Sequence, residues 1–246
     1  MKRIPTILVT ILVLAIVIVI ALWLNKHNQA IVVPDESVQQ SPLVTIVEET
    51  ITEENFSGTK PVIAGDSAVA VSARAYVAES IASFKARADA EVPGMKVQFP
   101  DAAAPSTYTI DIQAQYTASV ETESIVLESY SYTGGANGSS SYKVFTASRA
   151  TGILLTLSDL VPGNQQGAFT AYVQQQLLSW RPGGITSMVV FEEEVKNLTF
   201  ASFENFSLND NALTLYFDKY EIGPGAAGAM EFSIPRGDVA QYMKEL

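Results

Sequence analysis

The sequence predicts an α+β fold in which antiparallel sheets pack against helices, preceded by one N-terminal transmembrane helix. Three observations predict it. An uncharged apolar run lies near the start, a strict apolar–polar alternation follows position 109, and helical periodicity marks residues 67 to about 90 and 166–180. We expect a membrane anchor over residues 1–25, a polar linker over 26–42, and two packed halves over 43–150 and 151–246.

The composition excludes several kinds of site. The 246 residues include no Cys and a single His, His27. Thiol nucleophiles, disulfides and Cys-ligated metals are therefore excluded, and His-based triads and His-ligated metals nearly so. We expect no metal, no cofactor and no catalytic activity.

The acidic charge serves solubility in its simplest interpretation, and it would also attract a basic partner. Three of the 15 basic residues and none of the 26 acidic residues lie within the first 26 positions, so the rest of the chain has a net charge of −14. An acidic domain repels nucleic acid and anionic membrane surfaces, and it attracts basic proteins. We therefore expect no contact with nucleic acid.

The apolar run over residues 4–24 predicts a membrane span. As a helix it would be about 31 Å long at about 1.5 Å per residue, which matches a hydrocarbon core of about 30 Å. A cleaved signal peptide is the alternative, but the run is long for one and no small-x-small cleavage site follows. Lys2 and Arg3 favour a cytoplasmic N-terminus. This predicts a single-pass protein of the cell membrane with an extracytoplasmic C-terminal domain.

The first half begins with a strand and a helix. Residues 44–51 are rich in β-branched side chains, which predicts a strand. The stretch Gly65-Asp66-Ser67 offers an N-cap for a helix that runs to about residue 90 and is closed by Pro93-Gly94. One face of this helix is apolar, with Val77, Ile81, Phe84 and Ala88. Residues 101–106 read as a loop.

A meander of three antiparallel strands comes next. Apolar side chains at alternate positions from Ile110 to Val120 predict a strand with one buried face. Residues 121–123 turn the chain, residues 125–132 return, and residues 141–147 form the third strand.

The second half alternates helix and strands. Residues 166–180 predict an amphipathic helix with the apolar stripe Phe169, Tyr172, Val173, Leu177 and Trp180. Residues 203–208 and 212–217 predict a hairpin joined at Asn209-Asp210-Asn211. A calcium loop is the competing interpretation of that turn, although it lacks the Gly and the distal Glu of an EF-hand. Residues 231–234 form a last strand before a short helix.

The Gly-rich stretch over residues 134–138 has two interpretations. Three glycines in five residues and the pair Asn137-Gly138 indicate a connection between two strands. A phosphate cradle is the alternative, but no Lys-Ser/Thr pair follows as in a P-loop.

Four stretches, in order, resemble a known family. They are Tyr130-Ser131-Tyr132-Thr133-Gly134-Gly135-Ala136-Asn137-Gly138, Thr151-Gly152 with Leu157-Ser158-Asp159-Leu160, Leu213 to Phe217 with Tyr220-Glu221-Ile222-Gly223-Pro224, and Ala227-Gly228 with Phe232 to Pro235. The set is similar to the extracytoplasmic domain of RsiV-type anti-sigma factors, which also occurs in PdaC-type deacetylases. It departs from the family's motif at Asn137, where the family has His.

The resemblance implies a non-catalytic binding or sensing domain of a bacterial cell envelope. RsiV-type domains bind lysozyme, a basic protein, and this is the partner the resemblance implies. We do not expect an anti-sigma role, because only residues 1–3 precede the predicted span, and no deacetylase module follows. The binding residues implied by the motifs are Gly134, Gly135, Asn137, Gly138, Tyr220 and Glu221.

Two other functions stay open. A cell-wall glycan could stack on exposed aromatic side chains. A hydrolase could use paired carboxylates such as Asp218 and Glu221, and would need a raised pKa and a cleft.

Overall fold

The computed structural model describes residues 44–99, 108–181 and 190–244, which belong to one compact unit. Several predicted segments lie outside these ranges: the anchor over 4–24, the linker over 26–42, His27 and the loop over 101–106. No helix within the described ranges is long and apolar enough to cross a bilayer.

Nine strands and five α-helices form the described structure. The strands are β1 (Thr45–Thr52), β2 (Phe56–Ala64), β3 (Tyr108–Ala118), β4 (Thr122–Tyr132), β5 (Ser139–Ser148), β6 (Leu154–Leu155), β7 (Phe206–Leu208), β8 (Ala212–Phe217) and β9 (Met230–Pro235). The helices are α2 (Ala68–Gln98), α3 (Leu157–Leu160), α4 (Gly163–Ser179), α5 (Glu192–Asn197) and α6 (Arg236–Val239). The α+β class is therefore confirmed.

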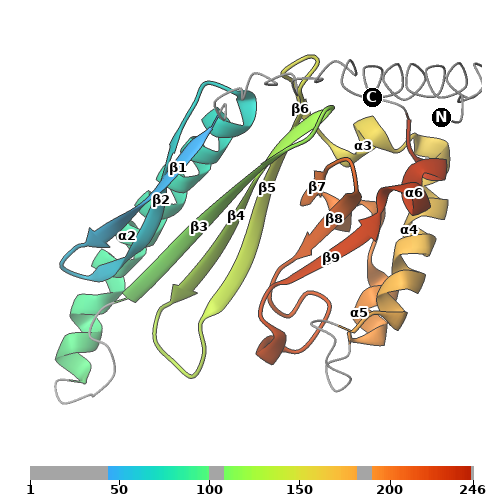
Figure 1. Ribbon diagram of the computed structural model, residues 1–246. Coiled ribbons are helices and arrows are strands. Elements are labelled where there is room, and N and C mark those ends of the chain that lie inside the picture. Colours follow the sequence, from blue (N-terminus) through green and yellow to red (C-terminus); the bar gives the residue numbers. More distant parts are fainter. Residues whose placement is uncertain (1–43, 100–107, 182–189, 245–246) are drawn as a thin grey trace, which may run out of the picture. The chain divides into compact units, whose positions relative to one another are not determined.

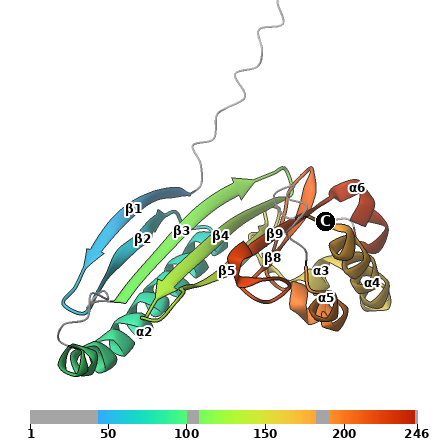
Figure 2. The same cartoon turned by 90° about the horizontal axis from the view of Figure 1, so that it is seen from below.

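The elements form four layers. Strands β1 to β6 make one sheet in sequence order, and β7-β8-β9 make a second, smaller sheet. Helix α2 covers one face of the large sheet, and the small sheet lies between the large sheet and helices α4 to α6 (Figures 1 and 2). Each helix-covered face has its own apolar core, and a third cluster of Val126, Tyr142, Val144 and Tyr216 lies between the sheets.

Helix α2 begins as predicted but ends later. The Ser67 side chain accepts a hydrogen bond from the Ala70 N–H, as expected of an N-cap. The helix then continues through Pro93 to Gln98, so the predicted stop at Pro93-Gly94 is wrong. Tertiary contacts explain the extension, because the Tyr108 hydroxyl donates to Glu91 Oε2 at 2.6 Å and lies 3.4 Å from Met95 Sδ.

Strand β2 was not predicted. Gly58, Lys60 and Pro61 interrupt its apolar pattern, and a Pro within a run argues against a strand. Pairing with β1 along its full length holds it in place. It also pairs in parallel with β3, from Phe56 opposite Tyr108 to Thr59 opposite Asp111.

The predicted meander is confirmed with shifted ends. Strands β3, β4 and β5 are antiparallel neighbours in register. The first turn comes earlier than expected, because Thr122 and Glu123 belong to β4 and are buried. Val120 is 81% exposed and lies outside β3, so its predicted place in the buried face is wrong.

The second half agrees with its prediction in outline. Phe169, Val173 and Leu177 of α4 are fully buried. The predicted hairpin is β7–β8, although Phe203 belongs to a 3₁₀ turn before it. In the connecting turn, Asn209 Oδ1 accepts the N–H groups of Asn211 and Ala212 at 2.8 and 2.9 Å, which explains the turn without a metal ion. Helix α5 was not predicted.

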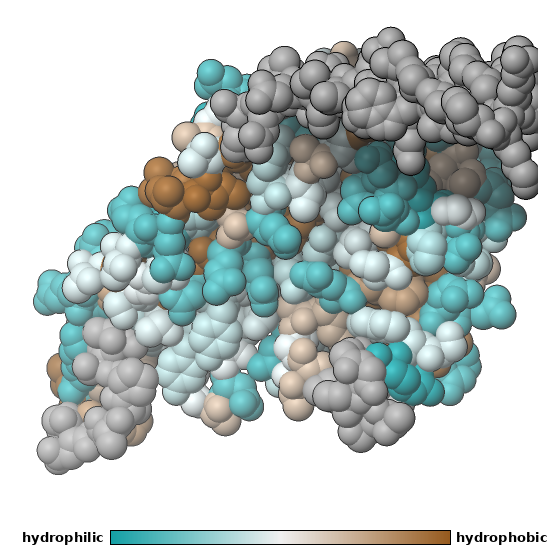
Figure 3. Space-filling model, in the orientation of Figure 1, coloured by the Kyte–Doolittle hydropathy of each residue, from teal (hydrophilic) through white to brown (hydrophobic). Residues whose placement is uncertain are grey.

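The hairpin β1–β2 leaves apolar side chains in contact with solvent. Val47 and Val62 face each other across the two strands and are 56% and 42% exposed. A hydrophobic patch is visible over this hairpin, whereas the surface over β3 to β5 is mostly hydrophilic (Figure 3).

The close approach of β2 to β3 predicts that Gly58→Ala is strongly destabilising. Gly58 has φ +152°, and a Cβ there would lie 1.7 Å from the Ile110 carbonyl oxygen. We expect a loss of about 3 kcal/mol or more in the free energy of unfolding, measured by urea denaturation.

Gly94→Ala is the matched control. A Cβ at Gly94 meets no atom within 4 Å, and the residue lies in α2. Here we expect a gain of about 1 kcal/mol, because Ala is the better helix former. Equal effects of the two substitutions would contradict the described packing of β2 on β3.

Candidate functional site

Side chains of the second half complete the edge of β5 that faces away from β4. The Tyr142 N–H donates to Asp218 Oδ1 at 2.7 Å, and the Val144 N–H donates to Asn205 Oδ1 at 3.2 Å. The Asn205 amide returns a hydrogen bond to the Tyr142 carbonyl at 3.3 Å, and the Lys219 N–H donates to the Ser140 carbonyl at 3.0 Å. These bonds satisfy main-chain groups that an open sheet edge would leave unpaired.

The same contacts fix the chain that follows β8. Glu221 Oε2 accepts the Asp218 N–H at 2.7 Å, so both carboxylates suggested for a hydrolase are bonded to main-chain amides. Burial raises the pKa of Glu221, and the bond from the Asp218 N–H partly opposes that rise. The two residues shape a turn.

This turn lies against the Gly-rich connection between β4 and β5. Lys219 Nζ donates to the Gly138 carbonyl at 2.6 Å, and the Tyr132 hydroxyl donates to the Gly135 carbonyl at 2.8 Å. We call residues 134–138 and 218–225 the loop cluster. The connection is a hairpin loop that leads directly into β5, which confirms the strand-connection interpretation over a phosphate cradle. Gly134 and Gly135 have positive φ, and Asn137 does not.

Tyr220 is the exposed aromatic side chain of the loop cluster. It is 58% exposed and has φ +73°, unlike any other non-glycine residue in the described ranges. A left-handed conformation costs a residue of this kind about 1 kcal/mol or more, and such strain gathers at functional sites. The ring lies over Gly225, where a Cβ would come within 2.2 Å of it, and Lys219 Nζ is 5.1 Å from its centroid.

Two carboxylates lie beside the loop cluster, where the two sheets meet. Glu128 of β4 is opposite Tyr142 of β5, and the Tyr142 hydroxyl donates to Glu231 Oε1 of β9 at 3.2 Å. We call Glu128, Tyr142 and Glu231 the acidic seam. Desolvation and the charge of Glu231 raise the pKa of Glu128, and desolvation with both carboxylates raises the pKa of Tyr142. No ion pair between described residues includes either carboxylate.

The seam does not make a metal site by itself. Within the ranges that the structure describes, no three His, Cys, Asp or Glu side chains converge as a metal would require. Two repelling carboxylates instead suit an ammonium or guanidinium group, which would reduce the repulsion between them.

The structure brings together most of the residues singled out in the sequence. Gly134, Gly135, Gly138, Tyr220 and Glu221 belong to the loop cluster, and Asn137 is exposed within it. The acidic seam was missed. Its sequence signal is weak, because Glu128 and Glu231 are ordinary exposed charged residues of two strands, 103 residues apart, and only the packing of the two sheets makes them neighbours.

The fold and the site define an α+β domain of two sheets joined by hydrogen bonds from β4 and β5 to the second half. Residues 158–237 match the family model described as protein of unknown function, DUF3298. The match falls within the predicted second half. The RsiV-type resemblance is a finer prediction that this match does not decide.

Two solved structures have the same fold. A DUF3298 family member from Bacteroides fragilis aligns with a TM-score of 0.59 and 16% identity, over 82% of this chain and 93% of that one. A DUF3298 family protein from Pseudomonas aeruginosa aligns with a TM-score of 0.53 and 23% identity, over 83% and 95%.

A curated relative is the protein named esterase Rv3036c from Mycobacterium tuberculosis. It is 31% identical over 120 residues, which are 48% of this chain. The chain spans about half the length of that relative, 51%.

The β5 edge predicts different effects for two substitutions of Asp218. Asp218→Ala leaves the Tyr142 N–H without its acceptor, so we expect the free energy of unfolding to fall by about 2 kcal/mol. Asp218→Asn keeps an acceptor oxygen and should cost less than half of that. Urea denaturation measures both, and an equal loss for the two variants would contradict a hydrogen-bonding role.

The acidic seam predicts a pH-dependent gain for Glu128→Gln. Folding raises the pKa of the Glu128 carboxyl above its ordinary value of 4.5. The protein therefore becomes less stable as the pH rises above 4.5, because the folded state then carries a charge that it disfavours. The variant should be more stable than the wild type at neutral pH, by at most about 0.5 kcal/mol for this solvent-screened group. The gain in stability should vanish at a pH below the ordinary pKa of 4.5, where the wild-type carboxyl is protonated in both states. A gain of the same size at both pH values would contradict this origin.

Proposed function

We propose that this chain is a membrane-anchored extracytoplasmic domain that binds a basic protein and has no catalytic activity. The acidic seam is the observation that supports this most directly. Glu128 and Glu231 repel each other, and neither has a cationic partner among the described ion pairs. A Lys or Arg side chain of a partner would be attracted to that position, and the net charge of −14 after residue 26 adds long-range attraction.

The loop cluster supplies the rest of the proposed contact surface. Tyr220 is an exposed aromatic ring of the loop cluster that lies over Gly225, and aromatic anchors contribute strongly to protein interfaces. The hydrophilic surface over β3 to β5 adjoins it (Figure 3). Lysozyme is the basic protein to test first, because the ordered motifs resemble those of RsiV-type domains. The membrane anchor in this proposal rests on the apolar run over residues 4–24.

Ester hydrolysis is a second candidate, which the name of the Mycobacterium relative raises. The Thr156 hydroxyl donates to Asp159 Oδ2 at 2.6 Å, but the same carboxylate oxygen also accepts the Thr156 N–H, and the pair caps α3. Ser158 of the Leu157-Ser158-Asp159-Leu160 stretch accepts a hydrogen bond from Gln166, and the single His of the chain, His27, lies outside the described ranges. Asp218 and Glu221 are bonded to main-chain amides. We expect no turnover of p-nitrophenyl acetate or butyrate above the background rate. Turnover that Ser158→Ala abolishes would establish the esterase function instead.

A salt-dependent binding experiment tests the proposal. Isothermal titration calorimetry of the detergent-solubilised full chain with hen lysozyme should show binding that weakens at high salt. The double variant Glu128→Gln/Glu231→Gln should weaken binding about tenfold or more, since charge pairs at interfaces contribute on this scale. Glu193→Gln/Glu194→Gln on α5 removes the same charge elsewhere and should change affinity by less than about threefold.

Two results would overturn this function. The first is absence of lysozyme binding at low salt by a chain that is folded. The second is equal weakening by both double variants, which would reduce the effect to net charge alone.

A cell-wall glycan is the alternative ligand, which Tyr220 could stack on. In that case isolated peptidoglycan should retain the wild-type chain at high salt, and Tyr220→Ala should release it. Glu128→Gln/Glu231→Gln should then have little effect.

A further inference from the structure

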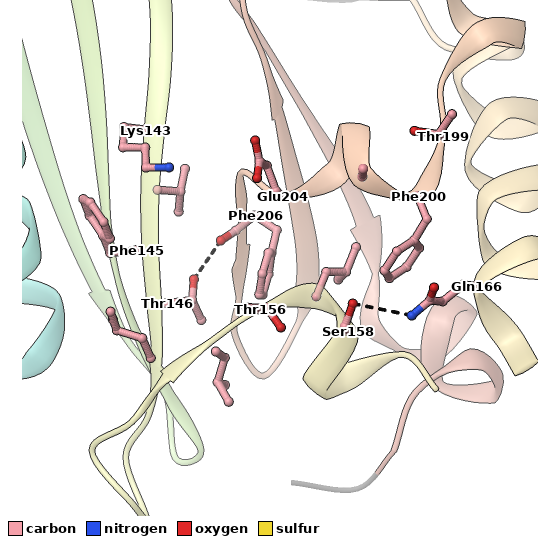
Figure 4. A pocket seen from close by; sticks show the side chains of 15 residues that line it. Lys143, Phe145, Thr146, Thr156, Ser158, Gln166, Thr199, Phe200, Glu204 and Phe206 are labelled. Atoms are coloured by element: carbon pink, nitrogen blue, oxygen red, sulfur yellow. Dashed lines mark hydrogen bonds between the residues drawn. The ribbon is translucent and has the colours of Figure 1, made fainter. Parts of the chain in front are cut away.

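A second concave site lies apart from the acidic seam, where β5 and β6 meet α3 and the 3₁₀ turn Phe200–Phe203. Its volume is about 650 Å³. Small-molecule sites typically measure about 300 to 1,000 Å³ and combine apolar walls with a few placed polar groups. This cavity has that composition (Figure 4).

Apolar side chains form the middle of the cavity. Phe206 is almost fully buried and Phe200 is partly buried, while Leu154 is 39% exposed. The Phe200 ring packs edge-on against Phe169 in the core between the small sheet and α4, with 5.9 Å between the ring centroids. The cavity therefore offers an apolar surface, and an apolar ligand group that covers it would be stabilised by the removal of that surface from water.

Two side chains of opposite charge line one end of the same cavity. Lys143 extends from β5 and Glu204 follows the 3₁₀ turn on the facing wall (Figure 4). They form no ion pair with each other or with any other described residue. Lys143 Nζ lies 5.7 Å from the centroid of the Phe145 ring. One cation and one anion are thus both available to a molecule in the cavity.

The other end is polar and neutral. Ser158 of α3 and Gln166 of α4 face each other there, with Gln166 Nε2 3.5 Å from Ser158 Oγ (Figure 4). Gln166 Nε2 is also 3.3 Å from the Val161 carbonyl, which fixes the orientation of the amide. The Ser158 hydroxyl can donate to or accept from a ligand amide.

We propose that this cavity binds an apolar amino acid or short peptide in its zwitterionic form. The ligand carboxylate pairs with Lys143, and its ammonium group pairs with Glu204. Its apolar side chain covers Phe200 and Leu154, and a peptide group reaches Ser158. A ligand with only one of the two charges would leave the other protein charge without a partner in a partly enclosed site, which makes the zwitterion the best match. This site is separate from the seam and independent of the function proposed above.

Calorimetry with four probes tests the inference on the detergent-solubilised full chain. Leucine and leucyl-leucine retain both charges. N-acetyl-leucine lacks the ammonium group, and leucinamide lacks the carboxylate. We expect at least one zwitterion to bind, and we expect each capped leucine to bind about tenfold or more weakly than leucine if leucine is the ligand. If only leucyl-leucine binds, its N-acetyl and amide derivatives take the place of the capped leucines.

Variants assign each charge to its partner. Lys143→Gln should weaken binding of the zwitterion about tenfold and leave the affinity for leucinamide unchanged, because leucinamide has no carboxylate. Glu204→Gln should weaken binding of the zwitterion by a similar factor and leave the affinity for N-acetyl-leucine unchanged, because that probe has no ammonium group. Lys60→Gln on β2 and Glu193→Gln on α5 remove the same charges elsewhere and should have no effect. Ala201→Trp fills the cavity from its exposed rim and should abolish binding without lowering the unfolding midpoint.

Three outcomes would overturn the inference: no binding of leucine or leucyl-leucine, equal affinity for capped and uncapped forms, or no loss on Lys143→Gln and Glu204→Gln. Because the lysozyme experiment changes Glu128 and Glu231 only, either proposal can fail without the other.

Discussion

The main-chain edge of β5 that faces away from β4 is the constraint on which the packing of the two halves depends, because only two of its residues pair with β6. A strand with one unpaired edge offers N–H and C=O groups that need partners. Here the partners are mostly side chains, since Asn205 and Asp218 accept from Val144 and Tyr142. The hydroxyl of Thr146 adds a bond to the Phe206 carbonyl at 2.7 Å. Because these bonds cross from one half to the other, they fix the small sheet against the large one.

That arrangement determines where both proposed sites form. The bonds from Asp218 and Lys219 bring the turn after β8 against the hairpin loop of β4–β5, which produces the loop cluster. Packing of β9 beside Tyr142 places Glu231 near Glu128 and produces the acidic seam. The cavity lies on the same junction, because Lys143 belongs to β5 and Glu204 precedes Asn205 directly. Each site therefore takes residues from both halves.

Much of the fold could be predicted from local patterns. The alternation in β3 and the stripe on α4 gave the correct element types, because those segments bury one face in a uniform way. Strand β2 and the last turns of α2 could not be predicted, since Pro61 and Pro93 argue locally for breaks. Pairing with β1 holds the strand in place, and the contact of the Tyr108 hydroxyl with Met95 Sδ, at 3.4 Å, helps to hold the helix beyond Pro93.

The site could be predicted only in part, for a related reason. Motif residues such as Gly138 and Tyr220 stand out in the sequence by their type and order. The four charged residues of the proposed sites do not stand out, because each is an ordinary charged residue whose proposed role depends on a neighbour far away in the chain. They are Glu128, Glu231, Lys143 and Glu204. Their relation is a property of how two sheets pack.

Native-state hydrogen exchange of the full chain tests most directly whether the β5 edge joins the halves. The account predicts that the amides of Tyr142 and Val144 exchange only through the same global opening as buried amides of β4 and β8, with equal free energies of exchange. The Asp218→Ala variant should lower all of these free energies together. Fast exchange of Tyr142 and Val144 beside a protected β4, or separate opening of the two halves, would contradict it.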